Sequence, residues 1–168
     1  ISMQELGVLQ MVSEHDNIEL YHVHTMKSEE HKLWNAGDII NTQQFSRQPS
    51  YNPPKRFRER AFEIVRQKDF PQMPSRTNCL FLSASLETAK VWYNILGGEK
   101  QLFKIKPIEG KCVFLDEKIY ENEEFTDAVM NSDANDYWSG DECIENNKIS
   151  VLFEGVFRIE EEIDFSTI

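Results

Sequence analysis

The chain has 168 residues, the length of one domain, and can bury roughly 70% of the surface that the unfolded chain exposes. Its formal net charge of −11 argues against broad, nonspecific attraction to nucleic acid or to anionic membranes. No apolar run approaches the roughly 20 residues that cross a bilayer, and no basic start precedes an apolar signal core. We therefore expect a cytoplasmic protein that makes no membrane contact.

The first predicted elements are a strand, a loop and a helix. Glu19–His24 contains β-favouring Tyr and Val, which favours a strand. Gln43–Pro54 is rich in Gln, Ser, Pro and Asn, which is typical of a long surface loop. Lys55–Lys68 has apolar residues at helical spacing and predicts a helix that is predominantly basic.

The middle of the chain predicts a strand, a helix and a hairpin. Cys79–Leu82 is a short apolar run suited to a buried strand, and Ser85 is a good N-cap for a helix that ends at Gly97. Gln101–Lys106 and Lys111–Leu115 alternate apolar and polar residues. We expect these two segments to pair as a hairpin, with Pro107 to Gly110 as the turn.

The last third is predicted to be helical and then extended. Glu117–Tyr137 has a helical composition, Trp138-Ser139-Gly140 ends it, and Ser150–Ile159 returns to a β-rich pattern. Strands and helices alternate at first and strands dominate later, so we expect an α+β fold rather than a doubly wound sheet. We expect residues 1–168 to form a single domain. The three cysteines, at wide spacings, fit neither a disulfide framework nor a metal site, and we expect inert thiols.

Two histidines are the first candidate site. On a strand, His22 and His24 point to the same face, because side chains repeat every two residues. A histidine pair can begin a metal site, but no further ligand motif accompanies it, so no metal is expected. The alternative from spacing alone is one partly buried histidine with its hydrogen bonds satisfied and one exposed histidine.

Two serines and a glutamate are the other candidates. Ser85 is explained by helix capping, whereas Ser83 is less easily explained, and no G-x-S-x-G motif surrounds either serine. Glu154 interrupts an apolar β-like run. It either lies on the solvent face of a strand or points into a pocket.

Taken together, these segments resemble the ADP-ribosyltransferase superfamily. The resemblance rests on Leu20–Thr25 (LYHVHT), Leu80–Ala89 (LFLSASLETA) and Ile149–Gly155 (ISVLFEG), which occur in the chain order of that superfamily. Gln101–Lys106 with Val113–Asp116 is similar to the hairpin that lies between the second and third of these elements. Tyr137-Trp138-Ser139-Gly140 is also similar to a motif of a related, uncharacterised bacterial family.

The resemblance implies a split β-sheet core with flanking helices and NAD as the ligand. It implies that His22 hydrogen-bonds the ribose of NAD and that Ser83 shapes the pocket floor. Further candidates for cofactor binding are Tyr21 and Tyr93 beside the nicotinamide, and Arg47, Arg56 or Arg76 at the pyrophosphate. A carboxylate beside the ribose would stabilise the positive charge that develops as nicotinamide leaves.

The catalytic carboxylate is where the chain departs from the pattern. The position expected for the family's glutamate holds Ser150, while Glu154 lies four residues later and Glu145 five earlier. Two functions stay open. One is a mono-ADP-ribosyltransferase of bacterial or phage type, such as a toxin or defence enzyme, that uses Glu154 or Glu145 on a protein or nucleic-acid acceptor. The other is a degenerate module that binds a nucleotide or a partner without turnover.

Overall fold

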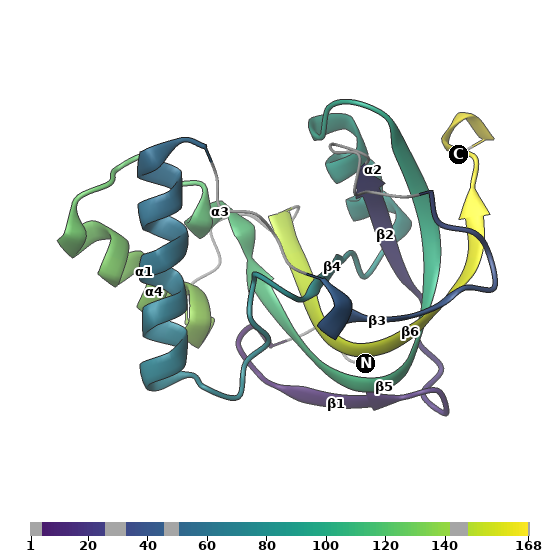
Figure 1. The fold of residues 1–168 in the computed structure, drawn as a ribbon, viewed down its shortest axis with the longest axis horizontal. Coiled ribbons are helices and arrows are strands. Elements are labelled where there is room, and N and C mark those ends of the chain that lie inside the picture. Colours follow the sequence, from purple (N-terminus) through teal and green to yellow (C-terminus); the bar gives the residue numbers. More distant parts are fainter. Residues whose placement is uncertain (1–4, 26–32, 46–50, 142–147, 168) are drawn as a thin grey trace.

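The computed structural model describes residues 5–25, 33–45, 51–141 and 148–167. They form one domain in which a curled antiparallel sheet is flanked by helices (Figure 1). The strands are β1 (Gln10–Ser13), β2 (Leu20–Thr25), β3 (Ile39–Asn41), β4 (Leu80–Leu82), β5 (Lys100–Asp116) and β6 (Ile149–Ile163). The helices are α1 (Pro53–Asp69), α2 (Leu86–Ile95), α3 (Glu117–Tyr120) and α4 (Asp127–Ser139), with 3-10 turns η1 (Thr42–Gln44) and η3 (Phe165–Thr167).

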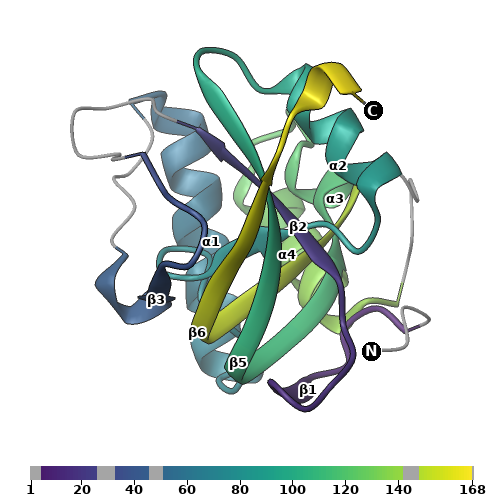
Figure 2. The ribbon, with the colours of Figure 1, turned by 90° about the vertical axis from the view of Figure 1, so that its right-hand side faces the viewer.

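Two long strands form the centre of the sheet. β5 and β6 pair along nearly their whole length, from Leu102 opposite Ile163 to Asp116 opposite Ile149. β1 and β2 pair with β5, whereas β3 and β4 pair with β6. Both long strands follow a deep bend together (Figures 1 and 2), so the short strands on their two edges approach each other across the curl.

The curl closes where β4 ends. The Tyr21 N–H donates to the Ser83 carbonyl at 2.9 Å, and the Ser83 N–H donates to the Tyr21 carbonyl at 2.7 Å. This isolated bridge joins β2 to the end of β4. β2 otherwise pairs with β5, and β4 pairs with β6, so the bridge joins the two sides of the sheet across the curl.

A pair of glycines lies at the bend of the long strands. Gly110 on β5 is directly opposite Gly155 on β6, and register shifts lie nearby at Lys104/Ile105 and Pro107/Glu109. A Cβ on Gly155 would lie 2.1 Å from the Glu109 carbonyl oxygen, and one on Gly110 would lie 2.3 Å from the Glu154 carbonyl oxygen. The two backbones approach so closely here that only glycine fits.

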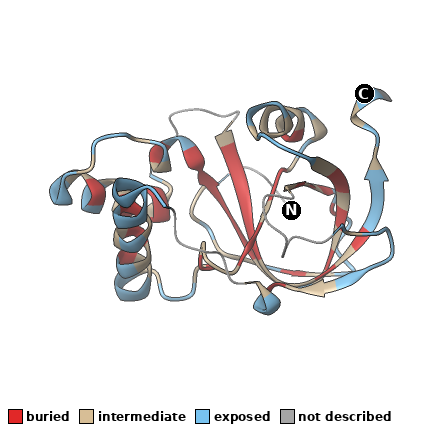
Figure 3. Cartoon of the chain, turned by 45° about the horizontal axis from the view of Figure 1, so that its top comes forward, coloured by how far each residue is buried: buried red, intermediate tan, exposed pale blue. Residues whose placement is uncertain are grey.

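Two hydrophobic cores lie on opposite faces of this sheet, because neighbouring residues of β5 such as Val113 and Phe114 belong to different cores. Buried residues run along both long strands (Figure 3). The first core joins strands around the curl and includes Leu20, Leu82 and Phe153. The second core packs the other face of β5 and β6 against α1 and α4. It is built on residues such as Leu152 and Trp138, whose indole N–H donates to the Phe62 carbonyl at 2.9 Å.

Side chains and one glycine set the ends of the helices. The Ser85 hydroxyl accepts from the Thr88 N–H and caps α2, as predicted, while Asn52 and Thr126 cap α1 and α4 in the same way. α4 ends at Gly140 in the left-handed conformation, with φ of 70°. A Cβ there would lie 2.3 Å from the Leu6 carbonyl carbon, so this glycine also lets the N-terminal segment pack against α4.

The structure confirms the α+β class and most of the predicted elements, and it corrects one. The predicted hairpin of Gln101–Lys106 and Lys111–Leu115 is wrong, because both segments belong to the continuous strand β5. Pro107 to Gly110 produces a bulge and a bend in that strand instead of a turn. Glu117–Tyr137 is split into α3 and α4, and the short strands β1 and β3 were not predicted.

Candidate functional site

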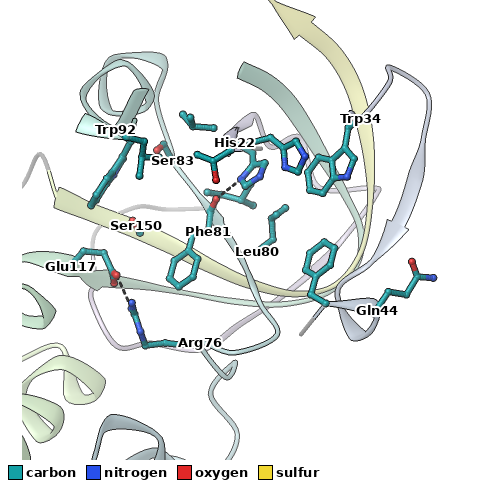
Figure 4. A pocket seen from close by; sticks show the side chains of 16 residues that line it. His22, Trp34, Gln44, Arg76, Leu80, Phe81, Ser83, Trp92, Glu117 and Ser150 are labelled. Atoms are coloured by element: carbon teal, nitrogen blue, oxygen red, sulfur yellow. Dashed lines mark hydrogen bonds and ion pairs between the residues drawn. The ribbon is translucent and has the colours of Figure 1, made fainter. Parts of the chain in front are cut away.

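A cavity of about 540 Å³ opens between β2, β4 and α2 (Figure 4). Its size is within the range of roughly 300–1,000 Å³ that is typical of small-molecule sites. Both ends of the cavity are polar or aromatic, and Leu80 and Leu82 of β4 contribute an apolar surface between them. The cavity is therefore the candidate binding site.

His22 and Ser83 both line this cavity, as the order of the motifs predicted. His22 is 8% exposed and Ser83 is 4% exposed. The Nδ1 atom of His22 lies 2.8 Å from the Phe81 carbonyl oxygen, which can only accept, so Nδ1 carries the proton. The bridge between β2 and β4 holds the two residues at one cleft, while their roles in binding stay predictions.

An aromatic wall forms one side of the cavity. The Trp34 ring stacks on His24 with centroids 3.8 Å apart, and it lies 5.2 Å from His22 and 6.0 Å from Phe45. The expectation that one of the two histidines is exposed is wrong, because His24 is only 7% exposed. A planar ring system of this kind offers a stacking surface for an aromatic ligand.

A buried ion pair lies across the cavity from Trp34 (Figure 4). Arg76 Nη1 donates to Glu117 Oε1 at 2.6 Å, and the Tyr137 hydroxyl donates to Glu117 Oε2 at 2.5 Å. Arg76 Nη1 also donates to the Tyr137 hydroxyl oxygen at 2.6 Å, and its guanidinium lies 3.7 Å from the Tyr120 ring centroid. Ser150, which is 4% exposed, lines the cavity beside this group.

The surroundings fix the protonation of two members of this group. Burial disfavours the charge on Arg76, but Glu117, Tyr137 and Tyr120 together outweigh it, so the pKa of Arg76 lies well above its ordinary value. Burial raises the pKa of the Tyr137 hydroxyl well above its ordinary value, despite the opposing charge of Arg76. At neutral pH, Arg76 is therefore a cation and Tyr137 a neutral donor.

α2 contributes a tryptophan to the cavity where the resemblance implied a tyrosine. Trp92 lines the cavity, and its buried indole N–H has no hydrogen-bond partner among the described residues. The neighbouring Tyr93 faces elsewhere and stacks on Phe165 with ring centroids 4.1 Å apart. Tyr93 is therefore not placed beside the ligand.

Two other predicted residues, Tyr21 and Arg56, do not line the cavity. The side chain of Tyr21 lies on the other face of β2, where its hydroxyl donates to Glu19 at 3.3 Å. Arg56 is an exposed residue of α1, away from the lining. Arg47 and Glu145 lie outside the described residues.

The expected catalytic acid is also displaced. Glu154 does not line the cavity, and its carboxylate lies 3.2 Å from Lys111 Nζ on the opposing strand, with 30% of the side chain exposed. Four residues earlier, Ser150 does line it. A register shift that would bring Glu154 to the place of Ser150 is absent, because Leu115 pairs with Ser150 and Lys111 with Glu154 without interruption between them.

Sequence reasoning missed Glu117, Trp34 and Trp92 as lining residues. Glu117 directly follows β5 and has a carboxylate at the start of a helix, which reads as ordinary capping chemistry. Trp34 lies in a segment without periodicity, and Trp92 shares its helix with Tyr93. The available signal was position alone, because Trp34 follows the Leu20–Thr25 motif and Trp92 follows Leu80–Ala89.

The cavity fits a nucleotide in some respects and not in others. The aromatic wall suits a nicotinamide or adenine ring, and His22, Ser83 and Glu117 can bond to sugar hydroxyls. Among the described residues, Arg76 is the single cationic side chain of the lining, and Glu117 and Tyr137 already occupy it. Arg76 is therefore placed to hold Glu117 rather than to bind a pyrophosphate.

The described part of the chain contains neither a cluster of metal ligands nor a membrane-spanning helix. Within it, no group of three or more His, Cys, Asp or Glu side chains could hold a metal ion. None of its helices has the length and the apolar character that crossing a bilayer requires. Cys79 and Cys112 are buried, while Cys143 lies outside the described residues.

Comparison with known proteins identifies a family. No curated protein matches the chain. The model of the family described as "Protein of unknown function (DUF2441)" matches residues 52–165, well over half of the chain. This range includes Ser83, Glu117, Tyr137-Trp138-Ser139-Gly140 and Ser150, whereas His22 precedes it. The chain belongs to the DUF2441 family.

Proposed function

We propose that the cavity binds NAD and that the protein is a mono-ADP-ribosyltransferase acting on a macromolecular acceptor, protein or nucleic acid. The observation that carries this proposal is that His22 and Ser83, which are 61 positions apart in the sequence, line one cavity across the β2–β4 bridge.

The lining offers suitable groups for each part of the ligand that reacts. A nicotinamide ring can stack on Trp34 or Trp92, and ribose hydroxyls can bond to Ser83 and to Nε2 of His22, whose Nδ1 donates to the Phe81 carbonyl oxygen. In the reaction, the bond from C1′ to the pyridinium nitrogen breaks and nicotinamide leaves with the bonding electron pair. The acceptor nucleophile supplies a new pair to C1′ and releases its proton.

The test is calorimetric titration of NAD into the full chain and into His22→Ala. We expect the wild type to bind, and we expect His22→Ala to weaken binding by about tenfold or more, which is about 1.4 kcal/mol. His15→Ala, which changes an exposed histidine in a turn, is the matched control and should bind as the wild type does. Absence of heat and of a thermal shift at millimolar NAD would refute the proposal.

A second function is favoured by Ser150 and Glu154. Because Glu154 faces Lys111 outside the cavity and Ser150 stands within it, the protein would bind the nucleotide without turnover if no other group supplied the carboxylate. Nicotinamide release separates the two functions. Tight NAD binding with no release, across protein and nucleic-acid acceptors, would favour the binding module.

The nicotinamide-release assay can also compare acceptors. On α1, Arg58 and Arg66 are paired with Asp133 and Glu63, which leaves Lys55, Arg56 and Arg60 as its exposed cations in the first half of the helix. These exposed cations favour an acceptor that carries phosphate groups.

A further inference from the structure

We propose that Glu117, and not Glu154, is the carboxylate that contacts the ribose of the bound ligand and stabilises the positive charge that develops at C1′. This inference rests on the proposed function, and it names the acid that the function requires. It assigns a role to a residue that lies outside the motifs discussed above and that follows directly from the end of β5.

Position is the first argument. β5 ends at Asp116, which pairs with Ile149, the neighbour of Ser150, and Glu117 is the first residue of α3. Glu117 and Ser150 therefore lie on adjacent chain segments, and both line the cavity. The carboxylate that is absent at Ser150 is present on the neighbouring chain segment at the same end of the cavity.

Composition of the lining is the second argument. Among the described residues that line the cavity, Glu117 is the single carboxylate. It is also 7% exposed, so a charge that develops beside it is stabilised in a site from which most water is excluded. Glu154, which pairs with Lys111 outside the cavity and has a side chain that is 30% exposed, has neither property.

Orientation is the third argument. Arg76 bonds to Oε1 and Tyr137 bonds to Oε2, so each carboxylate oxygen is held by one protein donor. An ionised carboxylate accepts about four hydrogen bonds, which leaves each oxygen able to accept a ribose hydroxyl. Arg76 and Tyr137 act through Glu117 and are positioning residues.

The chemical step is balanced without any further co-reactant when water is the acceptor. The C1′–N bond breaks, nicotinamide takes the bonding pair and becomes neutral, and a lone pair of water forms the new C1′–O bond. The proton of that water goes to solvent, and Glu117 stays a carboxylate throughout. The products are ADP-ribose, nicotinamide and a proton.

The experiment measures NAD affinity by calorimetry, and kcat and KM for nicotinamide release, on the full chain. Glu117→Gln should lower kcat by about 100-fold or more while changing the NAD affinity only a few-fold, since the amide keeps the shape and loses the charge. Asp133→Asn is the matched control. It removes a carboxylate from another buried arginine pair, Arg58–Asp133 at 2.9 Å, outside the cavity, and should keep release.

A second variant keeps the inference testable if Glu117→Gln does not fold. Tyr137→Phe keeps the Arg76–Glu117 ion pair and removes the donor to Oε2 together with one acceptor of Arg76, and it should lower kcat about tenfold with KM unchanged. Unchanged kcat in both variants would overturn the inference, as would loss of release in Glu154→Gln with release retained in Glu117→Gln. Release by the wild type that Glu117→Gln retains overturns the role of Glu117 alone. NAD binding with no release by the wild type overturns the transferase as well and leaves the binding module, and absent NAD binding overturns both functions.

Discussion

Three polar residues that line the cavity, His22, Ser83 and Glu117, are held in place by hydrogen bonds within the protein. His22 bonds to the Phe81 carbonyl, and Glu117 is fixed by Arg76 and Tyr137. Ser83 is fixed through its backbone, which exchanges two hydrogen bonds with Tyr21. Groups fixed in this way need little reorganisation when a ligand binds or reacts, and such preorganisation is where most electrostatic stabilisation in enzymes originates.

A buried thiol should make the protein sensitive to alkali. Burial raises the pKa of Cys112 from 9.0 to about 11, because the thiolate is poorly solvated in the first core. The folded state then holds a proton that the unfolded chain releases. The free energy of unfolding should be constant below about pH 9 and fall as the pH rises towards 11, by up to about 1.4 kcal/mol per pH unit.

Urea unfolding between pH 8 and pH 10 measures this slope. Cys112→Ala should flatten it, and the comparison is made between slopes because the substitution also removes packing. The range stops at pH 10 because burial also raises the pKa of Tyr120 and Tyr137, which contribute at higher pH. Equal slopes in the two proteins would show that Cys112 is not the responsible group.

Individual residues differed in how well the sequence predicted their place. His22 and Ser83 were predicted to share a cleft because each lies at a fixed position in a recognisable strand, and both do. Tyr93 was predicted to line the cavity, but its neighbour Trp92 does so instead. Consecutive residues of a helix point about 100° apart, so an error of one position moves the side chain to another face. Glu117 reaches the cavity only because of a strand pairing that no local pattern encodes.

At the scale of elements, the long strand β5 shows why turn signals can mislead. Proline and glycine within a short distance favour a turn when a segment is considered alone. β6 has 15 residues and pairs with β5 on both sides of this point, so continuing the strand satisfies more backbone groups than a turn would. Proline and glycine then serve as the site of the register shift and of the close approach.

The short strands were missed for a related reason. β1 has four residues and β3 has three, and each pairs with one neighbour at an edge of the sheet. A period of two residues has almost no length over which to show itself in such segments. In contrast, α1 and the capping of α2 were predicted because their signals are local.

The glycine pair at the bend gives a prediction for the sheet. Gly155→Ala would place a Cβ 2.1 Å from the Glu109 carbonyl oxygen and 2.7 Å from the Gly110 Cα, so the two strands must separate. We expect the substitution to lower the free energy of unfolding by about 3 kcal/mol or more. The measurement is chemical denaturation of both proteins.

The matched control is Gly97→Ala, which follows α2 where no heavy atom lies within 4 Å of the added Cβ. It should change stability by less than about 1 kcal/mol. If Gly155→Ala were as stable as Gly97→Ala, the strands would tolerate separation at the bend, and the close approach would not be what holds the curl.

At the scale of the whole molecule, the cavity depends on closure of the curl. The family match covers residues 52–165, which includes β4, α2, β5 and β6, but β2 lies before it. β2 pairs with β5 and bridges to Ser83, and it brings His22 and His24 to the cavity. The cavity is therefore formed jointly by the segment that the family pattern covers and by the strand that precedes it.

The two cores share the strands β5 and β6, so we expect the molecule to unfold as one cooperative unit. Adjacent residues of these strands alternate between the cores, as Val113 and Phe114 do, and neither core can lose its strand face without disturbing the other. The three tryptophans can test this, because Trp138 is fully buried in the helical core while Trp34 and Trp92 line the cavity. In the double variant Trp34→Phe, Trp92→Phe, only Trp138 fluoresces, and its urea transition should coincide with that of far-ultraviolet circular dichroism. In Trp138→Phe, the remaining tryptophans report from the cavity side, and their transition should coincide with the dichroism of that variant. A fluorescence transition that precedes loss of dichroism in one variant alone would show that the curl and the helical layer unfold separately.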